Sequence, residues 1–342
     1  MTNGRSGRIA VFGAGAWGTA LANLAARGGR EPRAETVVTL FARDCDHVAE
    51  MQATGVNARR LPGVPLLSNV RPTSDLAEAA ADADVILAVV PAQALRGLLE
   101  SLEPFVAGSK APIVVCAKGI EHGTGHFLSE VVSEVLPDHP PAVLSGPSFA
   151  QDVARGLPTA VALAAADAEL AAILAGRLAG PGFRVYSSTD MRGVELGGAA
   201  KNVLAVANGV AAGRDLGASA GAALVARGFA ELIRFGRAFG AEPATLMGLS
   251  GLGDLVLTCT SALSRNFSLG VALGRGQTIA EASARIGLAE GLYTCGVLVD
   301  LANAAGVDMP IAKAVDAVLA ERITIDEAIA ELLARPSKAE GV

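Results

Sequence analysis

One lysine stands alone in a long apolar stretch that is rich in small residues. Lys201 is the only ionisable residue between Glu195 and Arg214. A cation in such a helix either extends to water or lines a cavity. In a cavity, loss of solvent lowers the pKa of a lysine, which suits the amine to exchange a proton with a carbonyl oxygen. Gly197 and Gly198 each weaken a helix by about 1 kcal/mol relative to alanine, so we expect something to approach the backbone there.

Two further charged residues adjoin apolar segments. Asp254 follows Gly251 and Gly253 and precedes the apolar residues 255–257, so we expect its carboxylate to face a protected site. A helix cap between glycines is the alternative. Lys118 comes just after an apolar strand, and the carboxyl ends of strands face the ligand crevice in open α/β sheets. We expect it to contact an anion or a carbonyl group, with a lysine on a surface loop as the alternative.

Three consecutive polar residues have the donors that a phosphate requires. Ser264, Arg265 and Asn266 present a hydroxyl, a guanidinium and an amide together. Arginine can supply paired, charge-assisted hydrogen bonds to phosphate oxygens. The trio therefore predicts a phosphate contact, and an ordinary polar turn is the alternative.

The sequence GAGAWG at positions 13–18 directly follows the first predicted strand and opens a helix. This is the context in which a GxGxxG motif binds a dinucleotide. Gly13 permits the tight turn, Gly15 lets the backbone approach the pyrophosphate, and Gly18 allows the helix to pack closely on the strand. The helix N-terminus offers unpaired N–H groups and a positive dipole end to the phosphates. A glycine-rich turn without a ligand is the alternative.

The end of the second predicted strand bears on the choice between NAD and NADP. A carboxylate that binds the ribose 2′-hydroxyl is usual there in a site specific for NAD. Here Arg43 precedes Asp44, and Arg43 can meet a 2′-phosphate with a bidentate fork. We therefore expect NADP to be accepted and NAD to be tolerated. A solvated pair of loop residues is the alternative.

Two kinds of structure must position these residues. Strands are predicted at 8–12, 36–41, 85–90, 112–116 and 142–144, with helices such as 19–27, 45–54 and 127–135 between them. The strand at 85–90 is apolar at every position, which is typical of a parallel sheet covered on both faces. This alternation predicts a doubly wound sheet, to which residues 159–166 and 183–187 can also belong. Helical stretches dominate from about residue 189, so we place a domain boundary near Ser188, giving domains of 1–188 and 189–342.

Composition narrows the function further. The 342 residues carry a net charge of −6, with 51% hydrophobic and 18% charged residues. These values exclude disorder and argue against general binding to nucleic acid or to an anionic membrane. No apolar signal core precedes the first strand, and no run approaches the roughly 20 apolar residues that cross a bilayer. We therefore expect a cytoplasmic protein without stable membrane insertion.

The cysteines and histidines do not suggest a metal site. The four cysteines lie far apart with no CxxC pair, which fits a reducing compartment. His122 and His126 are separated by two glycines and lack an evident third ligand. We expect His47, in a charged stretch, and His139, between prolines, to be exposed. No metal is predicted.

Several motifs taken together resemble those of bacterial NAD(P)-dependent glycerol-3-phosphate dehydrogenases. The segments that carry the resemblance occur in the family's order and approximate spacing over residues 8–333. They are the glycine motif with Trp17, Lys118-Gly119, SGPSFA at 145–150, Lys201-Asn202, GLGD at 251–254 and SRN at 264–266. The resemblance implies an α/β fold with an N-terminal doubly wound Rossmann-type sheet and an all-helical C-terminal domain, like that of 6-phosphogluconate dehydrogenase. It also implies a homodimer.

The resemblance further implies a reaction and a role for each matching residue. The reaction is reversible hydride transfer between NAD(P)H and dihydroxyacetone phosphate, giving sn-glycerol 3-phosphate for phospholipid synthesis. Lys201 resembles the general acid–base of the family. The other implied substrate contacts are Lys118, Gly146, Ser148, Asp254, Ser264, Arg265 and Asn266. The implied cofactor contacts are Gly13, Gly15, Ala16, Trp17, Gly18, Arg43, Lys118, Ala150, Arg265, Leu288 and Glu290.

Two other functions remain open at this point. A β-hydroxyacid or phosphogluconate-type dehydrogenase shares the glycine motif and a glycine four residues before the lysine, but usually carries Asn four positions after that lysine. Here that position is Ala205. A dinucleotide-binding regulator without turnover would need the glycine loop but neither Lys201 nor Asp254.

Overall fold

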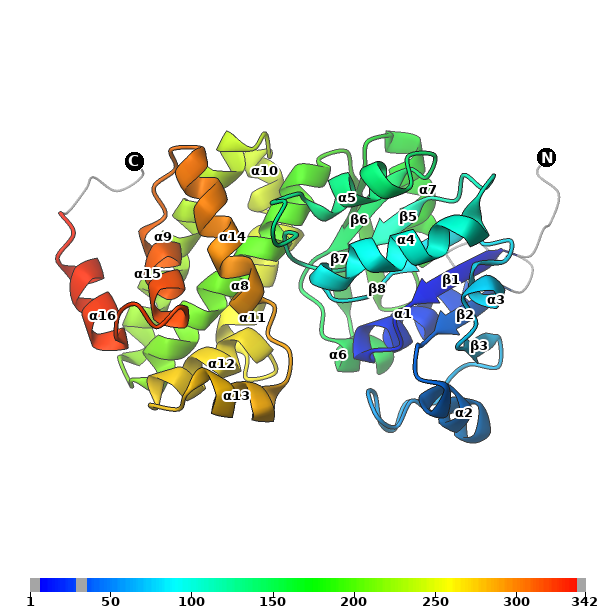
Figure 1. The fold of residues 1–342 in the computed structure, drawn as a ribbon, viewed down its shortest axis with the longest axis horizontal. Helices are drawn as coiled ribbons and strands as arrows, with labels where there is room; N and C mark the ends of the chain where they lie inside the picture. The colour runs from blue at the N-terminus through cyan, green and yellow to red at the C-terminus, as the bar shows by residue number, and fades with distance from the viewer. Residues whose placement is uncertain (1–6, 29–35, 337–342) are drawn as a thin grey trace.

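The computed structural model describes residues 7–28 and 36–336. The expectation about a signal sequence rests partly on residues 1–6, which lie outside the described residues. The molecule has two parts side by side (Figure 1): a sheet covered by helices, and an all-helical part that begins after residue 190. The fold class predicted from the alternation of strands and helices is confirmed.

One sheet of eight strands forms the frame of the first part. Its order is β3-β2-β1-β4-β5-β6-β7-β8, and within residues 7–28 and 36–336 only the β6–β7 pair of strands is antiparallel. The strands are β1 (Arg8–Phe12), β2 (Val37–Phe41), β3 (Val70–Thr73), β4 (Val85–Ala88), β5 (Ile113–Val115), β6 (Pro141–Ser145), β7 (Thr159–Ala165) and β8 (Phe183–Ser188). The chain order reverses between β1 and β4, and such a switch point creates a crevice beyond the carboxyl ends of the strands.

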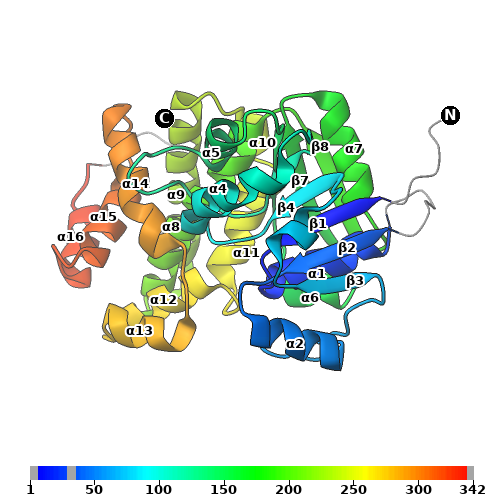
Figure 2. The same cartoon turned by 45° about the vertical axis from the view of Figure 1, so that its right-hand side comes forward.

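Helices cover both faces of the sheet, as the wholly apolar strand predicted. Val85 and Leu87 of β4 pack on one face with α1, α6 and α7, whereas Ile86 and Ala88 pack on the other with α3, α4 and α5. The elements between the strands are α1 (Ala16–Ala26), α2 (Cys45–Thr54), α3 (Leu76–Ala80), the 3-10 turn η1 (Ala92–Ala94), α4 (Leu95–Val106), α5 (Leu128–Val135), α6 (Ala150–Ala154) and α7 (Ala168–Leu178). Figure 2 shows α2 below the β3 edge of the sheet.

The second part is built around one long buried helix, α8 (Met191–Gly213). The elements that follow are α9 (Gly217–Ala238), α10 (Pro243–Leu246), the π-helical turn η2 (Leu249–Gly253), α11 (Asp254–Thr260), α12 (Arg265–Gly274), α13 (Ile279–Ile286), α14 (Gly291–Ala304), α15 (Pro310–Leu319) and α16 (Ile325–Leu333). Residues on nearly every side of α8 are buried, because helices surround it.

Glycines let α8 and α12 cross with their backbones in contact. A Cβ atom at Gly209 would lie 2.1 Å from the carbonyl oxygen of Phe267, and one at Gly270 would lie 2.1 Å from that of Val206. Gly213 and Gly274 form a second such approach one turn further on. Neither helix can shift along the other without a clash, so the crossing fixes their register.

Three expectations differ from the structure. Strand β3 was not predicted, because Pro72 interrupts its short sequence; Pro is tolerated there since β3 is an edge strand. His47 and His139 are buried rather than exposed. His47 Nε2 pairs with the side-chain oxygen of Asn57 at 2.8 Å, and His139 Nδ1 pairs with the carbonyl oxygen of Ala111 at 2.9 Å. In each ring one nitrogen thus has a partner inside the protein, which favours burial.

In the part of the chain that the structure describes, no single helix has the length and apolar character to span a membrane, although the bent pair 243–260 and 265–274 meets both criteria together.

Candidate active site

The glycine loop after β1 has the geometry that a dinucleotide phosphate needs. A Cβ atom at Gly13, where φ is +120°, would lie 2.3 Å from the carbonyl oxygen of Val89, and one at Gly18 would lie 1.8 Å from that of Gly13. Both glycines are therefore required for packing. A Cβ atom at Gly15 would meet nothing within 4 Å, so this position faces open space. Gly15 is also the N-cap of α1 and provides no side-chain acceptor, which leaves the first N–H groups available to an anion.

A buried polar network holds this loop from behind, and sequence reasoning missed it. Asn57 is completely buried and donates to the carbonyl oxygen of Ala14 at 3.0 Å and to Thr19 Oγ1 at 2.8 Å. Thr19 in turn donates to the carbonyl oxygen of Gly15 at 2.8 Å. His47 Nε2 pairs with the side-chain oxygen of Asn57, Oδ1. Asn57 lies in a loop with no local motif, so only the folded structure reveals its contact with the glycine loop.

Asp44, just after β2, already has hydrogen-bond and ion-pair partners within the protein. Asp44 accepts the N–H of His47 as the N-cap of α2, and Arg59 Nη1 lies 3.0 Å from its carboxylate. The bond from His47 and the charge of Arg59 hold the pKa of Asp44 below its usual value. Arg43 is exposed beside it. The carboxylate that could bind a ribose hydroxyl is thus already paired with Arg59, and the exposed Arg43 guanidinium can meet an anion.

A buried carboxylate joins two lysines that lie far apart in the sequence. Asp254, at the start of α11, is 1% exposed. Its Oδ2 lies 2.6 Å from Lys118 Nζ, and its Oδ1 lies 2.7 Å from Lys201 Nζ. Lys201 Nζ also lies 2.7 Å from Thr258 Oγ1, and Lys118 Nζ donates to the carbonyl oxygen of Gly146 at 3.0 Å. Asp254 therefore faces the lysines rather than capping its helix, and Lys201 does not extend to water.

Burial sets the ionisation of this cluster. Loss of solvent lowers the pKa of Lys201 to about 8; the Asp254 carboxylate opposes this shift and the nearby Lys118 adds to it. Burial alone would raise the pKa of Asp254, but Lys118 and Lys201 together hold it below its usual value. With two ammonium groups around one carboxylate, the cluster carries a net positive charge, which favours an anionic ligand in a site shielded from water.

The two glycines before Lys201 allow the close approaches expected of them. A Cβ atom at Gly197 would lie 2.5 Å from the carbonyl oxygen of Ser250 in η2. One at Gly198 would lie 2.7 Å from Ser145 Oγ and 3.2 Å from Lys118 Cγ. Helix α8 therefore lies directly against the end of β6 and the loop that follows β5, which brings Lys201 to the carboxyl edge of the sheet.

The trio at the start of α12 connects to the same region. Asn266 is buried; it donates to Asn202 Oδ1 at 2.9 Å and accepts the N–H of Gly291 at 2.9 Å. Ser264 is the N-cap of α12 and accepts the N–H of Phe267, whereas Arg265 is exposed. Two members of the trio thus hold the backbone in place, and the Arg265 guanidinium is the one turned outward.

Glu290 and its neighbours lie close to the Lys118 loop. Burial raises the pKa of Glu290, against the opposing effects of the Ala92 backbone N–H and the charge of Arg265. Its Oε2 lies 3.9 Å from the position of a Cβ atom at Gly119, and Thr294 Oγ1 lies 3.4 Å from it. Thr294 Oγ1 and Ser145 Oγ are both buried and have no hydrogen-bond partner among the residues that the structure describes. These orphaned hydroxyls mark the junction as a place where a polar ligand fits.

The remaining predicted residues lie around this junction. Ser148 Oγ donates to the carbonyl oxygen of Gly146, where φ is +149° and a Cβ atom would meet Val161. Ala150 begins α6 and packs, like Ala16 and Trp17, at the margin of the core that contains α1. Leu288 is half-buried two residues before Glu290.

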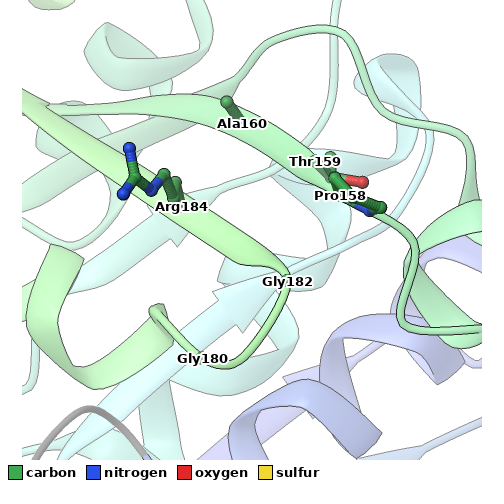
Figure 3. Close-up of a pocket in the computed structure, with 6 residues that line it drawn as sticks. All are labelled: Pro158, Thr159, Ala160, Gly180, Gly182 and Arg184. Carbon is green, nitrogen blue, oxygen red and sulfur yellow. The ribbon is translucent and has the colours of Figure 1, made fainter.

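The structure thus brings Lys118, Gly146, Lys201 and Asp254 into direct contact. Thr258 belongs with them and was missed, although its position four residues after Asp254 on a helix placed both on one face. A hollow of about 360 Å³ beside the starts of β7 and β8 (Figure 3) includes none of the predicted residues; it is lined by Pro158, Thr159, Ala160, Gly180, Gly182 and Arg184. Among the described residues no group of three or more His, Cys, Asp or Glu side chains could hold a metal.

An open glycine loop and a buried lysine–carboxylate cluster at the same edge of a doubly wound sheet define an NAD(P)-dependent oxidoreductase. Comparisons with known proteins make this specific. The family described as NAD-dependent glycerol-3-phosphate dehydrogenase matches with its N-terminus at residues 8–171 and its C-terminus at residues 190–330. The chain belongs to this family.

Individual relatives agree with this assignment. The chain is 68% identical over 333 residues to glycerol-3-phosphate dehydrogenase [NAD(P)+] of Beijerinckia indica subsp. indica, covering 97% of both chains. It is 60% identical to the enzyme of the same name from Bradyrhizobium sp., covering 97% of this chain and 98% of the relative. Its fold matches the crystal structure of glycerol-3-phosphate dehydrogenase from Coxiella burnetii with a TM-score of 0.90 and 43% identity, covering 96% of this chain and 99% of that one.

Proposed function

We propose that this chain reduces dihydroxyacetone phosphate to sn-glycerol 3-phosphate with NADPH or NADH, and catalyses the reverse reaction. The observation that carries the proposal is the Lys201 ammonium, which is buried, held by Asp254 and Thr258, and poised by its pKa of about 8 to exchange a proton near neutral pH. Bound NAD(P)H would supply the hydride.

The protein's own residues would manage the charge that develops. Negative charge forms on the carbonyl oxygen as its carbon is reduced, and Lys201 Nζ donates a proton to that oxygen. A preorganised donor of this kind is worth about 3–4 kcal/mol. The contact with Asp254 orients the amine and favours its charged form, and the contact with Thr258 Oγ1 fixes its position further. Lys118, on the opposite side of the carboxylate, adds positive charge where the substrate is to lie.

Other predicted residues would hold the two ends of the ligands. The guanidinium of Arg265 would bind the substrate phosphate, together with Ser264, Asn266, Gly146 and Ser148, and this would align the carbonyl with the amine. The open loop at Gly15 and the uncapped start of α1 would hold the dinucleotide phosphates. Arg43 would meet the 2′-phosphate of NADP. The further cofactor contacts that we propose are Gly13, Ala16, Trp17, Gly18, Lys118, Ala150, Arg265, Leu288 and Glu290.

The oxidation of NADPH and of NADH, each measured separately with dihydroxyacetone phosphate, tests the proposal. We expect turnover with both cofactors and appearance of glycerol 3-phosphate. Consumption of NADPH with 3-hydroxyisobutyrate semialdehyde but not with dihydroxyacetone phosphate would favour the β-hydroxyacid class instead. Cofactor binding with no turnover on either substrate would favour a regulator.

We further propose a cytoplasmic homodimer with domains at 1–188 and 189–342 whose product enters phospholipid synthesis. The free state of all four cysteines supports a reducing compartment. The dimer is proposed from the family to which the chain belongs. Sedimentation equilibrium of the purified protein tests the dimer, and a single species of monomer mass would exclude it.

A further inference from the structure

A second buried carboxylate on α8 bonds to the first part of the molecule. Glu195 is 7% exposed. Its Oε1 accepts the backbone N–H of Ser129 at 2.8 Å, and its Oε2 lies 2.7 Å from Ser129 Oγ. Ser129 is also buried and lies in the first turn of α5. The two contacts therefore form one bidentate bond between the helix that carries Lys201 and a helix on the face of the sheet.

The start of α5 needs this acceptor. Its N-cap, Phe127, has no polar side-chain atom, and Glu130 accepts the N–H of Phe127 rather than that of Ser129. An N–H group in the first turn has no partner within its own helix, and a carboxylate there is also favoured by the helix dipole. Glu195 thus supplies from another part of the chain the cap that α5 lacks.

Charged and apolar side chains lie around this buried bond. Arg192, one turn before Glu195, pairs with Glu130, and its guanidinium lies 3.7 Å from the centre of the Phe127 ring. Beside these contacts, Val194 packs on Val143 of the sheet. Arg192 and Glu130 are the charged groups that face the carboxylate, with opposite effects on its ionisation. A bond shielded in this way resists competition from solvent.

The bond joins the two segments that carry the lysines. Helix α5 ends the segment that begins at Lys118, and the pairing of Ile120 with Phe127 closes that segment into a compact loop. Glu195 lies six residues before Lys201 on α8, and between them a Cβ atom at Gly198 would lie 3.2 Å from Lys118 Cγ. Figure 1 shows α5 beside α8 at the junction of the two parts. A shift of α5 relative to α8 would therefore move Lys118 relative to Lys201.

We infer that Glu195 is a positioning residue for the reaction: its bidentate bond to Ser129 fixes the placement of the Lys118 loop against the Lys201 helix. The inference rests on the proposed function only for its kinetic consequence. The reacting atoms must be aligned to within fractions of an ångström, so a small displacement at the lysines slows the chemical step more than it weakens cofactor binding.

Three variants test this: Glu195→Ala, Glu195→Gln and Ser129→Ala. We expect Glu195→Ala to lower kcat with dihydroxyacetone phosphate at least tenfold, while the Kd for NADPH changes less than twofold. Glu195→Gln should stay within threefold of the unaltered protein, because its amide can accept from the Ser129 N–H and donate to Ser129 Oγ. Ser129→Ala should fall between them, because it keeps the backbone contact.

Glu231→Ala is a matched control. Glu231 is equally buried and caps α15 through the N–H groups of Ile311 and Ala312, but it lies wholly within the helical part. Both alanine variants should lower the melting temperature. Only Glu195→Ala should raise the primary deuterium isotope effect measured with deuterated NADPH, because hydride transfer becomes more rate-limiting. Equal isotope effects and equal kcat per folded enzyme in the two variants would overturn the inference.

Hydrogen exchange separates this inference from the proposed function. We expect Glu195→Ala, but not Glu231→Ala, to speed amide exchange in residues 128–131 and 195–202. If the unaltered protein failed to turn over dihydroxyacetone phosphate, the proposed function would fall, and the exchange rates would still decide the role of Glu195. Unchanged exchange in both segments would show that the bond does not join them.

Discussion

Asp254 and Lys201 form a buried ion pair across 2.7 Å, although 53 positions separate them in the sequence. Burial lowers the pKa of Lys201, because desolvation disfavours the charged amine. The Asp254 carboxylate opposes this effect, because it favours the charged amine. The effect of burial is the larger one, so the Lys201 ammonium, with a pKa of about 8, is a stronger acid than that of a free lysine.

The first prediction concerns that amine directly. Lys201→Ala should lower kcat at least about a hundredfold, because the proton donor is removed. The Kd for NADPH, measured by quenching of the fluorescence of Trp17, should stay within about twofold. Equal loss of cofactor binding would make the lysine a structural residue instead.

The pH dependence of the rate should report the pKa of Lys201. Reduction requires the ammonium form, so kcat/KM for dihydroxyacetone phosphate should fall as the pH rises through about 8. Oxidation of glycerol 3-phosphate requires the neutral amine, so its rate should rise over the same range. Asp254→Asn removes the charge that favours the ammonium and should move both limbs to lower pH. If the pH dependence of either rate were unchanged in this variant, the titrating group would not be Lys201.

Arg43 should matter for one cofactor only. Arg43→Ala should raise the KM for NADPH about tenfold, because a charge-assisted contact to the 2′-phosphate is lost. The KM for NADH should change less than twofold. Arg71→Ala, an exposed arginine on β3, is the control. Parallel increases for both cofactors would show that Arg43 does not recognise the 2′-phosphate.

Asn57 should support cofactor binding without touching the cofactor. Asn57→Leu removes the donors to Ala14 and Thr19 and leaves buried acceptors unpaired, at a cost of about 1–3 kcal/mol in the free energy of unfolding. The Kd for both NADPH and NADH should rise, while the KM for dihydroxyacetone phosphate should be nearly constant. The exposed Asn303 provides the control substitution. Unaltered cofactor affinity in a folded Asn57→Leu protein would remove this role.

Gly198, three residues before Lys201, should not tolerate even the methyl group of alanine. Gly198→Ala would place a Cβ atom 2.7 Å from Ser145 Oγ and 3.2 Å from Lys118 Cγ, so Lys118 must move and kcat should drop more than tenfold. Gly176→Ala on α7 is the matched change, because a Cβ atom at that position would have no neighbour within 4 Å. It should leave kcat unaltered and stabilise the helix by up to about 1 kcal/mol. Similar kinetics in both variants would contradict the packing argument.

Much of the fold follows from local patterns, and the site follows only in part. The wholly apolar β4 predicted a sheet covered on both faces, because its alternate residues serve two cores. Lys201 and Asp254 each stood out by chemistry and setting. Their direct contact did not, since it depends on how η2 and α11 fold back against α8. Asn57 and Glu195 gave no signal, because each acts on a backbone group distant in sequence.

The glycine-lined crossing of α8 and α12 has a consequence for selectivity. Lys201 is carried by one of these helices and Arg265 by the other, and main chain touches main chain where they meet. The backbone contact thus fixes where the two helices place the Cα atoms of Lys201 and Arg265 relative to one another. If Lys201 and Arg265 make the substrate contacts proposed for them, this fixed backbone spacing would favour phosphorylated ketones of one length over those with one more carbon.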